Sequence, residues 1–323
     1  MNRTIGALAL ALLLFIVPPG LRAQPVPAAA PVARIVVPFA PGANTDLLAR
    51  MYAQAFTEAL GTRFIVENKP GGGTNIAAES VARAAPDGQT LFVAQFASHA
   101  ANRWLYDKLP YDPIKDFVGV GMMAETPFFL LVNAKSPVHS VADLVRFARQ
   151  KPGGVSYGSS AIGSPIHIAG ELLRMQAGIQ AVHVPYRGAG PAAADLVAGN
   201  LDFMFDATAV NLVKSGQLRA LAVADSERWP GQPDIPSMAE QGFPDFRVKG
   251  FFALVAPAHT PAPILERLNA VMVAYASRPE VQARMIGMQV SALPLSQAQT
   301  DAYLLRESTR WEQVVKASGA KVE

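Results

Sequence analysis

The sequence contains no cysteine, and this absence excludes several classes of chemistry. Without thiols the chain forms no disulfide, no thiolate metal site and no cysteine nucleophile, and it has no lipoprotein-type N-terminal thiol anchor. Charged residues are also sparse, at 16%, whereas half of the 323 residues are apolar. A chain of this length and composition can bury a large core and favours two domains over one.

The sequence also lacks a strong excess of either charge. It has 28 basic and 25 acidic side chains, and two of the basic ones, Arg3 and Arg22, precede residue 24 in a stretch without acids. No run rich in Lys and Arg is interleaved with aromatic residues, so the sequence predicts no nucleic-acid partner.

The first residues have the order of a secretory signal. Arg3 precedes an apolar run from Ile5 to Val17, which is followed by helix-breaking prolines and by Ala23. The run is shorter than the roughly 20 residues that cross a bilayer, which argues against the alternative of a transmembrane anchor. We predict a signal peptide over residues 1–23, a Pro/Ala spacer over residues 24–33, and export to the periplasm.

Short apolar strands and amphipathic helices alternate along the rest of the chain. Strands are expected at residues 34–39, 63–67 and 90–94, with a helix from Leu47 that stops at Gly61 and Thr74 as the N-cap of another. This alternation predicts βαβ units and mainly parallel sheets.

The second half repeats the pattern. Ser140 and Asp143 form a capping-box pattern, and the helix after Ser164 has Pro165 at its first position and Gly178 at its end. The Pro-rich residues 228–246 are interpreted as a surface connection.

Four loops share one composition: residues 38–46, 70–75, 95–102 and 158–164. They are rich in Gly, Ser, Thr, Asn and Gln and poor in Lys and Arg. Loops that follow parallel strands gather at the carboxyl edge of the sheet, where helix N-termini present unpaired N–H groups. Together the loops predict recognition of a carboxylate by neutral donors; the alternative for any one of them is simple helix capping.

Enzyme motifs are incomplete. The segment GSSAIG has Ile162 where a nucleophile elbow requires Gly, and GGGTNIA lacks the last Gly of a dinucleotide fingerprint. The five histidines show no metal-binding spacing. We therefore predict neither catalysis nor a metal or cofactor.

Two acids stand beside the predicted loops. Asp46 lies near the start of its helix, where the simplest role is interaction with the helix dipole, and a second role is to hold water or ligand. Asp206 directly follows the apolar strand LDFMF and could accept a hydrogen bond from a ligand or connect two lobes. Phe39 and Phe96 stand at strand exits and could line a pocket.

Several longer blocks resemble a known family. They are VPFAPGANTDLLAR, VENKPGGGTNIAAESVARAAPDGQTL, SHAANRWLY, YGSSAIGSPIHIAGELL, VPYRGAGPAAADLVAGNLDFMFD and LRALAV. In this order they are similar to the Bug-type (TctC-like) substrate-binding receptors of tripartite tricarboxylate transporters. The resemblance covers nearly all of the chain after the predicted signal peptide.

The resemblance implies a periplasmic-binding-protein type II fold, the Venus flytrap: two α/β lobes joined by two crossover strands. Residues 34–130 and 248–323 would form the first lobe, and residues 131–247 the second. It further implies a receptor that captures a small carboxylate between the lobes and delivers it to membrane permease subunits. We expect the receptor to be a monomer. A sensory role with a signalling partner and, less favoured, a secreted α/β hydrolase remain as alternatives.

The resemblance also implies site residues. Backbone N–H groups of the first loop would bind one carboxylate, Asp46 would help to hold water, and Ser98, His99 and Asn102 would match a Thr-His pair and a later Asn. The full set is Phe39, Ala40, Gly42, Ala43, Asn44, Asp46, Gln95, Phe96, Ser98, His99, Asn102, Ser159, Ser160, Ala161 and Asp206.

Four of these positions depart from the family pattern. Ala43 and Asn44 replace a Gly followed by a small residue or Pro, and Gln95 and Phe96 replace smaller residues. The ligand is consequently open among di-, tri- and aromatic carboxylates, and stacking of a flat acid near Phe96 is a hypothesis.

Overall fold

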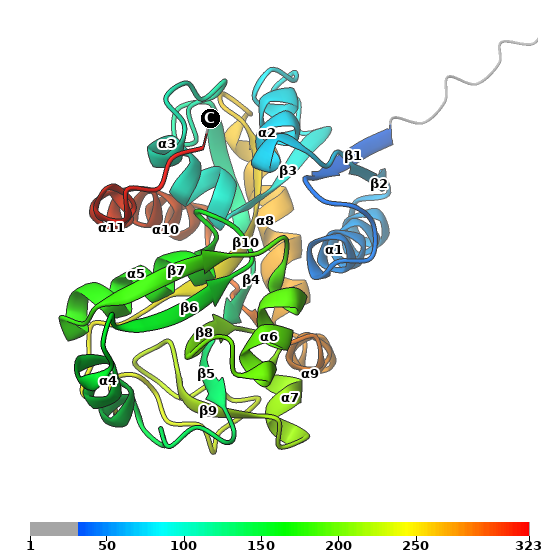
Figure 1. Ribbon diagram of the computed structural model, residues 1–323. Helices are drawn as coiled ribbons and strands as arrows, with labels where there is room; N and C mark the ends of the chain where they lie inside the picture. The colour runs from blue at the N-terminus through cyan, green and yellow to red at the C-terminus, as the bar shows by residue number, and fades with distance from the viewer. Residues whose placement is uncertain (1–31, 323) are drawn as a thin grey trace, which may run out of the picture. The chain divides into compact units, whose positions relative to one another are not determined.

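The computed structural model describes residues 32–322, which form two α/β lobes, each built on its own β-sheet (Figure 1). The predicted signal peptide and the spacer up to residue 31 lie outside the described residues. The last two spacer positions, Val32 and Ala33, belong to the first strand, which begins two residues earlier than expected. Among residues 32–322, no helix is both long and apolar enough to span a bilayer.

The first lobe carries a six-stranded sheet in the order β11-β4-β10-β3-β1-β2. Its strands are β1 (Val32–Val37), β2 (Arg63–Asn68), β3 (Thr90–Gln95), β4 (Phe117–Pro127), β10 (Lys249–Pro257) and β11 (Ser291–Ala292). Its helices are α1 (Asn44–Leu60), η1 (Gly72–Thr74), α2 (Asn75–Ala82), the π-helical η2 (Ala97–Ala101), α3 (Asn102–Leu105), α8 (Ala262–Ala276), α9 (Pro279–Gly287), α10 (Gln297–Arg310) and α11 (Glu312–Ser318).

The second lobe carries a five-stranded sheet in the order β7-β6-β8-β5-β9. Its strands are β5 (Phe129–Asn133), β6 (Val155–Ser159), β7 (Ala181–Pro185), β8 (Phe203–Asp206) and β9 (Leu218–Val223). Its helices are α4 (Val141–Gln150), α5 (Pro165–Ala177), α6 (Ala189–Ala198) and α7 (Val210–Lys214).

The two-lobe fold is as predicted, but both sheets are mixed rather than mainly parallel. In the first lobe β1 pairs in parallel with β2 and β3, whereas β10 runs antiparallel to both β3 and β4. In the second lobe β5 runs antiparallel to β8 and β9. The antiparallel strands are those that carry the chain between the lobes, since they enter each sheet without a βαβ crossover.

Local signals in the sequence place most of the helix ends correctly. Gly61 ends α1 in the left-handed conformation at φ 69°, and Gly178 ends α5 at φ 58°. The Oγ atoms of Ser140 and Ser164 accept from N–H groups three residues later, at 3.0 and 3.3 Å. Thr74 was expected to cap α2, but its side chain makes no cap hydrogen bond and its φ is 84°.

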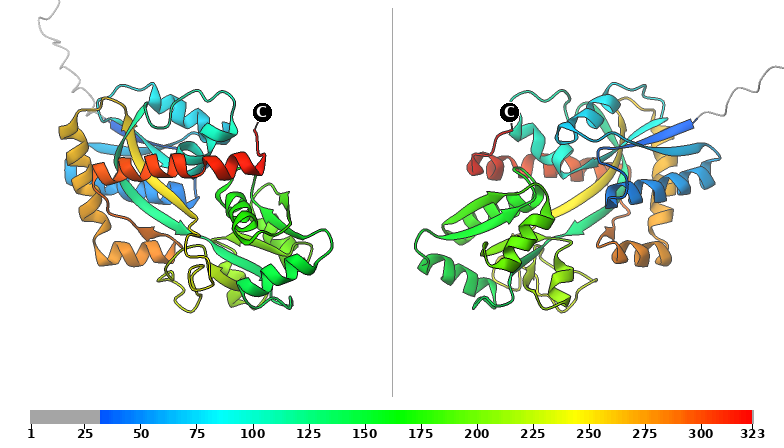
Figure 2. Two further views of the ribbon diagram at one scale, coloured as in Figure 1. Left: turned by 90° about the vertical axis from the view of Figure 1, so that its left-hand side faces the viewer. Right: turned by 45° about the vertical axis from the view of Figure 1, so that its right-hand side comes forward.

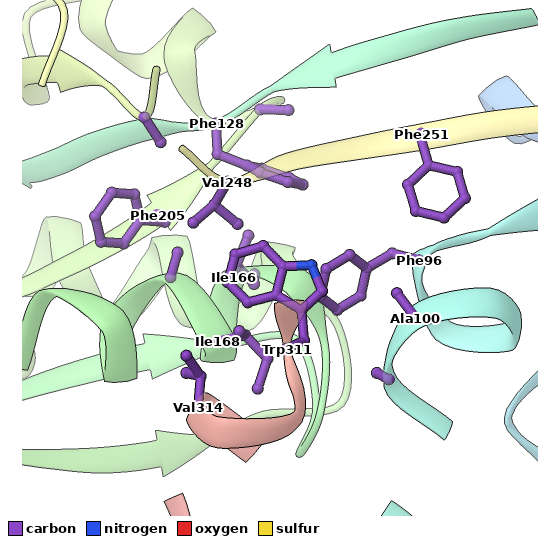
Figure 3. Packing of buried hydrophobic residues seen from close by; sticks show 14 of the residues in the cluster. Phe96, Ala100, Phe128, Ile166, Ile168, Phe205, Val248, Phe251, Trp311 and Val314 are labelled. Atoms are coloured by element: carbon purple, nitrogen blue, oxygen red, sulfur yellow. The ribbon is translucent and has the colours of Figure 1, made fainter. Parts of the chain in front are cut away.

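The lobes share one apolar core. We call the buried residues Phe96, Phe128, Ile166, Phe205, Val248, Phe251 and Trp311 the interlobe cluster (Figure 3). Trp311, only 1% exposed, stands with its ring centroid 5.6 Å from that of Phe96. Ile166 and Phe205 come from the second lobe, so the cluster joins both lobes by direct packing.

The chain passes between the lobes at Phe128 and again between β9 and β10. Figure 2 shows β4 and β10, which pair with each other, extending together toward the second lobe. The Pro-rich residues 228–246, expected at the surface, are mostly exposed or half-buried, but Trp229, Met238 and Phe246 within them are buried. Prolines interrupt regular structure without preventing burial of the apolar side chains between them, so these three residues anchor the connection to the core.

Candidate ligand-binding site

A cavity of about 450 Å³ lies between the two lobes and has the size of a small-molecule site. All four loops predicted from the sequence contribute to its walls. The lining residues are Phe39, Asn44, Gly73, Thr74, Gln95, Phe96, Ala97, Asn102, Leu105, Tyr106, Thr126, Phe128, Ser160, Ala161, Ile162, Gly163, Ser164, Pro165, Ala207, Thr208, Gly250, Phe251, Phe252, Gln289 and Val322.

The turn between β1 and α1 forms one wall through Phe39 and Asn44. Asn44 is the first residue of α1, whose N-cap, Ala43, supplies no side-chain hydrogen bond. The N–H groups of an uncapped helix start attract anions. Ala40, Gly42 and Ala43, also expected to contact the ligand, are exposed on the same turn but lie outside the lining.

Asp46 holds this turn in place from behind. Its carboxylate accepts from Gly42 N at 3.1 Å, Asn68 Nδ2 at 3.0 Å and Arg50 Nε at 2.9 Å. Burial alone would raise the pKa of Asp46, but these hydrogen bonds outweigh it and hold that pKa below its ordinary value. Asp46 is 2% exposed and outside the lining, so it positions the turn and does not face the ligand.

The turn after β3 brings Gln95, Phe96 and Asn102 to the cavity. Asn102 donates to Gly73 O at 2.8 Å and to Asn75 Oδ1 at 2.7 Å, and so connects this turn to the glycine-rich loop. Ser98, in contrast, bonds to Gln95 N at 3.1 Å and faces the core. Ser98 is therefore not proposed as a ligand contact.

His99 is also turned inward. It is fully buried, its ring lies 4.9 Å from that of Phe117, and its Nδ1 is 3.0 Å from Ser98 Oγ. Burial lowers the pKa of His99 from 6.5 to about 3. The residue is thus a neutral core histidine rather than a ligand contact.

The second lobe contributes Ser160, Ala161 and the four residues that follow them. Ser159 is buried beneath this loop, where its Oγ donates to Ala161 O at 3.0 Å and lies 2.6 Å from His183 Nε2. His183 in turn stacks on His167, whose Nδ1 accepts from Gly163 N at 3.0 Å. This serine–histidine contact shapes the loop. Ser159 is 0% exposed and lies outside the lining, so the Ser159–His183 pair does not face the cavity.

Asp206 holds the turn after β8 in place, as Asp46 holds the turn between β1 and α1. Its Oδ1 accepts from Thr208 N at 2.7 Å and from Ala209 N at 2.6 Å. Ala207 and Thr208 then line the cavity, while Asp206 itself is 4% exposed and lies outside the lining.

Several lining residues were missed by the sequence analysis. All of them are neutral, and they come from strands, from segments that directly follow a helix or a strand, and from the C-terminal segment: Tyr106, Thr126, Phe128, Ala207, Thr208, Gly250, Phe251, Phe252, Gln289 and Val322. No local motif marks Thr126 or Gln289, because the sheet order alone brings β4 and the residues before β11 to the site. Thr74 was recognised, but only as a helix cap.

The lining is electrically neutral. The described residues around the cavity include no Lys, Arg, His, Asp or Glu. Across residues 32–322, no group of three or more His, Cys, Asp or Glu side chains is arranged to hold a metal ion. An anion in the cavity must therefore be stabilised by N–H and hydroxyl dipoles.

The buried His99 predicts a loss of stability in acid. The unfolded chain protonates this imidazole below about pH 6.5 and the folded chain does not, so stability is complete above that pH and falls toward pH 3. Between pH 7.5 and pH 5, His99 should account for a loss of about 2 kcal/mol in unfolding free energy.

Urea unfolding at pH 7.5 and pH 5 measures this loss of unfolding free energy. The His99→Phe variant should lose about 2 kcal/mol less than the unchanged chain between the two pH values. The exposed His139, changed to Phe, is the control. An unchanged pH difference in the His99 variant would contradict the prediction.

The chain is similar to known proteins over most of its length. Residues 48–320 match the model of the tripartite tricarboxylate transporter family receptor. The chain belongs to this receptor family. The family consists of solute-binding receptors, not enzymes.

Relatives of this receptor include protein BugT of Bordetella pertussis, 33% identical over 294 residues that cover 90% of each chain. Among solved structures, R. palustris Rpa4515 with adipate is 35% identical, with a TM-score of 0.77 over 90% of this receptor and 98% of that chain. MatC from Rhodopseudomonas palustris with bound malate is 33% identical, with a TM-score of 0.72 over 88% and 98%.

Proposed function

We propose that this receptor captures a small organic carboxylate in the cavity and delivers it to the membrane permease of a tripartite tricarboxylate transporter. The main support for the proposal is the start of α1, which has no side-chain cap and lies at the wall of the cavity. The lining of this cavity between the two lobes is neutral. The relatives solved with adipate and malate support the ligand class.

Seven of the predicted site residues are kept as contacts because they line the cavity: Phe39, Asn44, Gln95, Phe96, Asn102, Ser160 and Ala161. Two lobes close on the ligand in this proposal. They have the expected limits, residues 34–130 with 248–323 for the first lobe and residues 131–247 for the second. Binding would favour the closed arrangement because only there do both lobes contact the same molecule.

Thermal denaturation with a panel of organic acids tests the capture step. A ligand at one hundred times its Kd stabilises the native state by about 2.7 kcal/mol, which raises the melting temperature measurably. At least one mono-, di- or tricarboxylate should do so and be recovered unchanged. If no acid stabilises the chain, or an acid is converted to product, the proposal fails.

The delivery step needs a separate experiment in cells. Uptake of the acid found by the panel should fall when the gene for this chain is deleted and return when it is restored. Unchanged uptake, with a signalling output lost instead, would favour the sensory alternative.

A further inference from the structure

Tyr106 differs from most tyrosines of the chain because its hydroxyl has no partner in the protein. The sequence has seven tyrosines, all within residues 32–322. Five of them direct the hydroxyl to a protein oxygen. The other two are Tyr106 and Tyr275, whose hydroxyls form no hydrogen bond within the described residues. Tyr275 lies on α8 with its ring against Tyr52, away from the cavity, whereas Tyr106 lines the cavity.

The hydroxyl of Tyr106 stands at the cavity wall, beside the exposed Gly73, which is also part of the lining. A Cβ atom added to Gly73 would lie 2.5 Å from Tyr106 Oη and 3.6 Å from its Cζ, so the oxygen is the nearest part of the side chain. Six side-chain nitrogen and oxygen atoms of residues 32–322 are buried without a partner, and Tyr106 Oη is not one of them. Because this oxygen is unpaired and is not buried, a molecule in the cavity can reach it.

Few hydroxyl groups of the lining are free to bind a ligand. The hydroxyl-bearing residues of the lining are Thr74, Tyr106, Thr126, Ser160, Ser164 and Thr208. The threonine hydroxyls of the first lobe are buried, and those of Ser164 and Thr208 donate to oxygens two or three residues away. The hydroxyls that remain are those of Tyr106 in the first lobe and Ser160 in the second. Ser160 was predicted as a ligand contact from the sequence, but Tyr106 was missed.

Asn102 holds Tyr106 and Gly73 together. Its side chain donates to Gly73 O at 2.8 Å, and its backbone carbonyl accepts from Tyr106 N at 3.0 Å. Leu105, the residue before Tyr106, is buried, and its carbonyl accepts from Val322 N at 3.0 Å. The backbone of Tyr106 is thus fixed on both sides, and a tyrosine side chain has little conformational entropy to lose. The hydroxyl is therefore in place before a ligand arrives, which lowers the cost of binding.

A phenol hydroxyl suits the neutral lining. It can donate or accept, and its bond to a carboxylate oxygen is charge-assisted, about twice as strong as a hydrogen bond between neutral groups. Among the described residues of the lining there is no Lys, Arg or His to supply such a bond. An accessible hydroxyl donor is therefore one of the few side-chain groups here that stabilise an anion.

We propose that Tyr106 is a ligand-binding residue whose hydroxyl donates a hydrogen bond to a carboxylate oxygen of the bound acid. The inference rests on the proposed function and adds a contact that lies outside the seven predicted from the sequence.

Calorimetric titration of the Tyr106→Phe variant tests the proposal, with benzoate, adipate, malate and citrate as probes. For each probe that binds the unchanged chain, the variant should raise the Kd at least about ten-fold, because it deletes the donor and keeps the ring. Urea unfolding without ligand should have the same midpoint in both, since the hydroxyl has no partner in the protein. The control is Tyr275→Phe, which removes the other unpaired tyrosine hydroxyl and should change neither quantity.

A second variant, Gly73→Ala, tests the same bond through the position of the hydroxyl. The added Cβ displaces Tyr106 Oη, so the Kd should rise about ten-fold in the otherwise unchanged chain. In the Tyr106→Phe background that Cβ meets only the ring at 3.6 Å, an ordinary contact. The double variant should therefore bind within about two-fold of Tyr106→Phe. Losses of affinity that add up in the double variant would contradict the proposed bond.

The outcomes separate this inference from the proposed function. A Tyr106→Phe variant that binds within about two-fold of the unchanged chain would overturn the inference and leave carboxylate capture intact. An equal loss of affinity in Tyr275→Phe, or a loss in Tyr106→Phe that comes with a lower unfolding midpoint, would overturn it as well. Failure of all four acids to bind the unchanged chain would contradict both the inference and the proposed function.

Discussion

Replacing Asp46 by alanine should remove about 3 kcal/mol of unfolding free energy and abolish measurable ligand binding. The substitution leaves Gly42 N and the Asn68 amide without their acceptor, and it leaves Arg50 without its partner. The turn that carries Phe39 and Asn44 then loses its anchor, although Asp46 itself lies outside the lining. Urea unfolding and titration with the acid found by the panel measure the two effects.

The chain offers a matched control for this variant. Glu79 and Arg83 form another acid–arginine pair four residues apart on a first-lobe helix, and the Glu79 side chain is 33% exposed against 3% for Asp46. Glu79→Ala should cost about 0.5 kcal/mol or less and leave binding unchanged. Equal costs for the two variants would show that Asp46 is an ordinary surface partner.

Replacing Gly163 by alanine should weaken ligand binding by about 30-fold, close to 2 kcal/mol. Gly163 is in the second lobe with φ +74°, and a Cβ there would overlap the Cδ1 atom of Leu105 in the first lobe. The extra methyl group must therefore displace the Leu105 side chain at the rim of the cavity, where both residues are part of the lining and the two lobes meet.

Backbone strain must be distinguished from this clash. Gly153 has a similar φ of +80°, and a Cβ there would meet nothing within 4 Å, so Gly153→Ala should lower stability without changing affinity. Leu105→Ala combined with Gly163→Ala should recover part of the lost affinity. An affinity loss of the same size in Gly153→Ala, or no recovery in the double variant, would show that the effect is not contact between the lobes.

The fold could be predicted in two stages. Periodicity and capping residues such as Ser164, Pro165 and Gly178 placed individual helices, because these signals act over one helical turn. Chain length favoured two domains, but their form as two lobes joined by crossover strands came only from resemblance to the family. The mixed sheets escaped prediction since pairing of β10 with β3 and β4 joins residues more than one hundred positions apart.

The candidate site was predicted at the level of loops rather than side chains. All four polar loops reach the cavity, yet Ser98 and His99 face the core because the π-helical turn η2 rotates them inward. Asp46 and Asp206 bond to backbone N–H groups of their own turns, a role that a sequence pattern does not distinguish from ligand contact. Thr126 and Gln289 are near the ligand only through tertiary structure.

The position of β10 between β3 and β4 constrains how the chain acquires its structure. The strands on either side of β10 belong to the first 127 residues, but β10 itself starts at Lys249. An emerging polypeptide that has released only its N-terminal half holds an unfinished first sheet with two open edges. Folding of the first lobe therefore cannot be completed before the last quarter of the chain has been synthesised. The lobe that begins first is completed last.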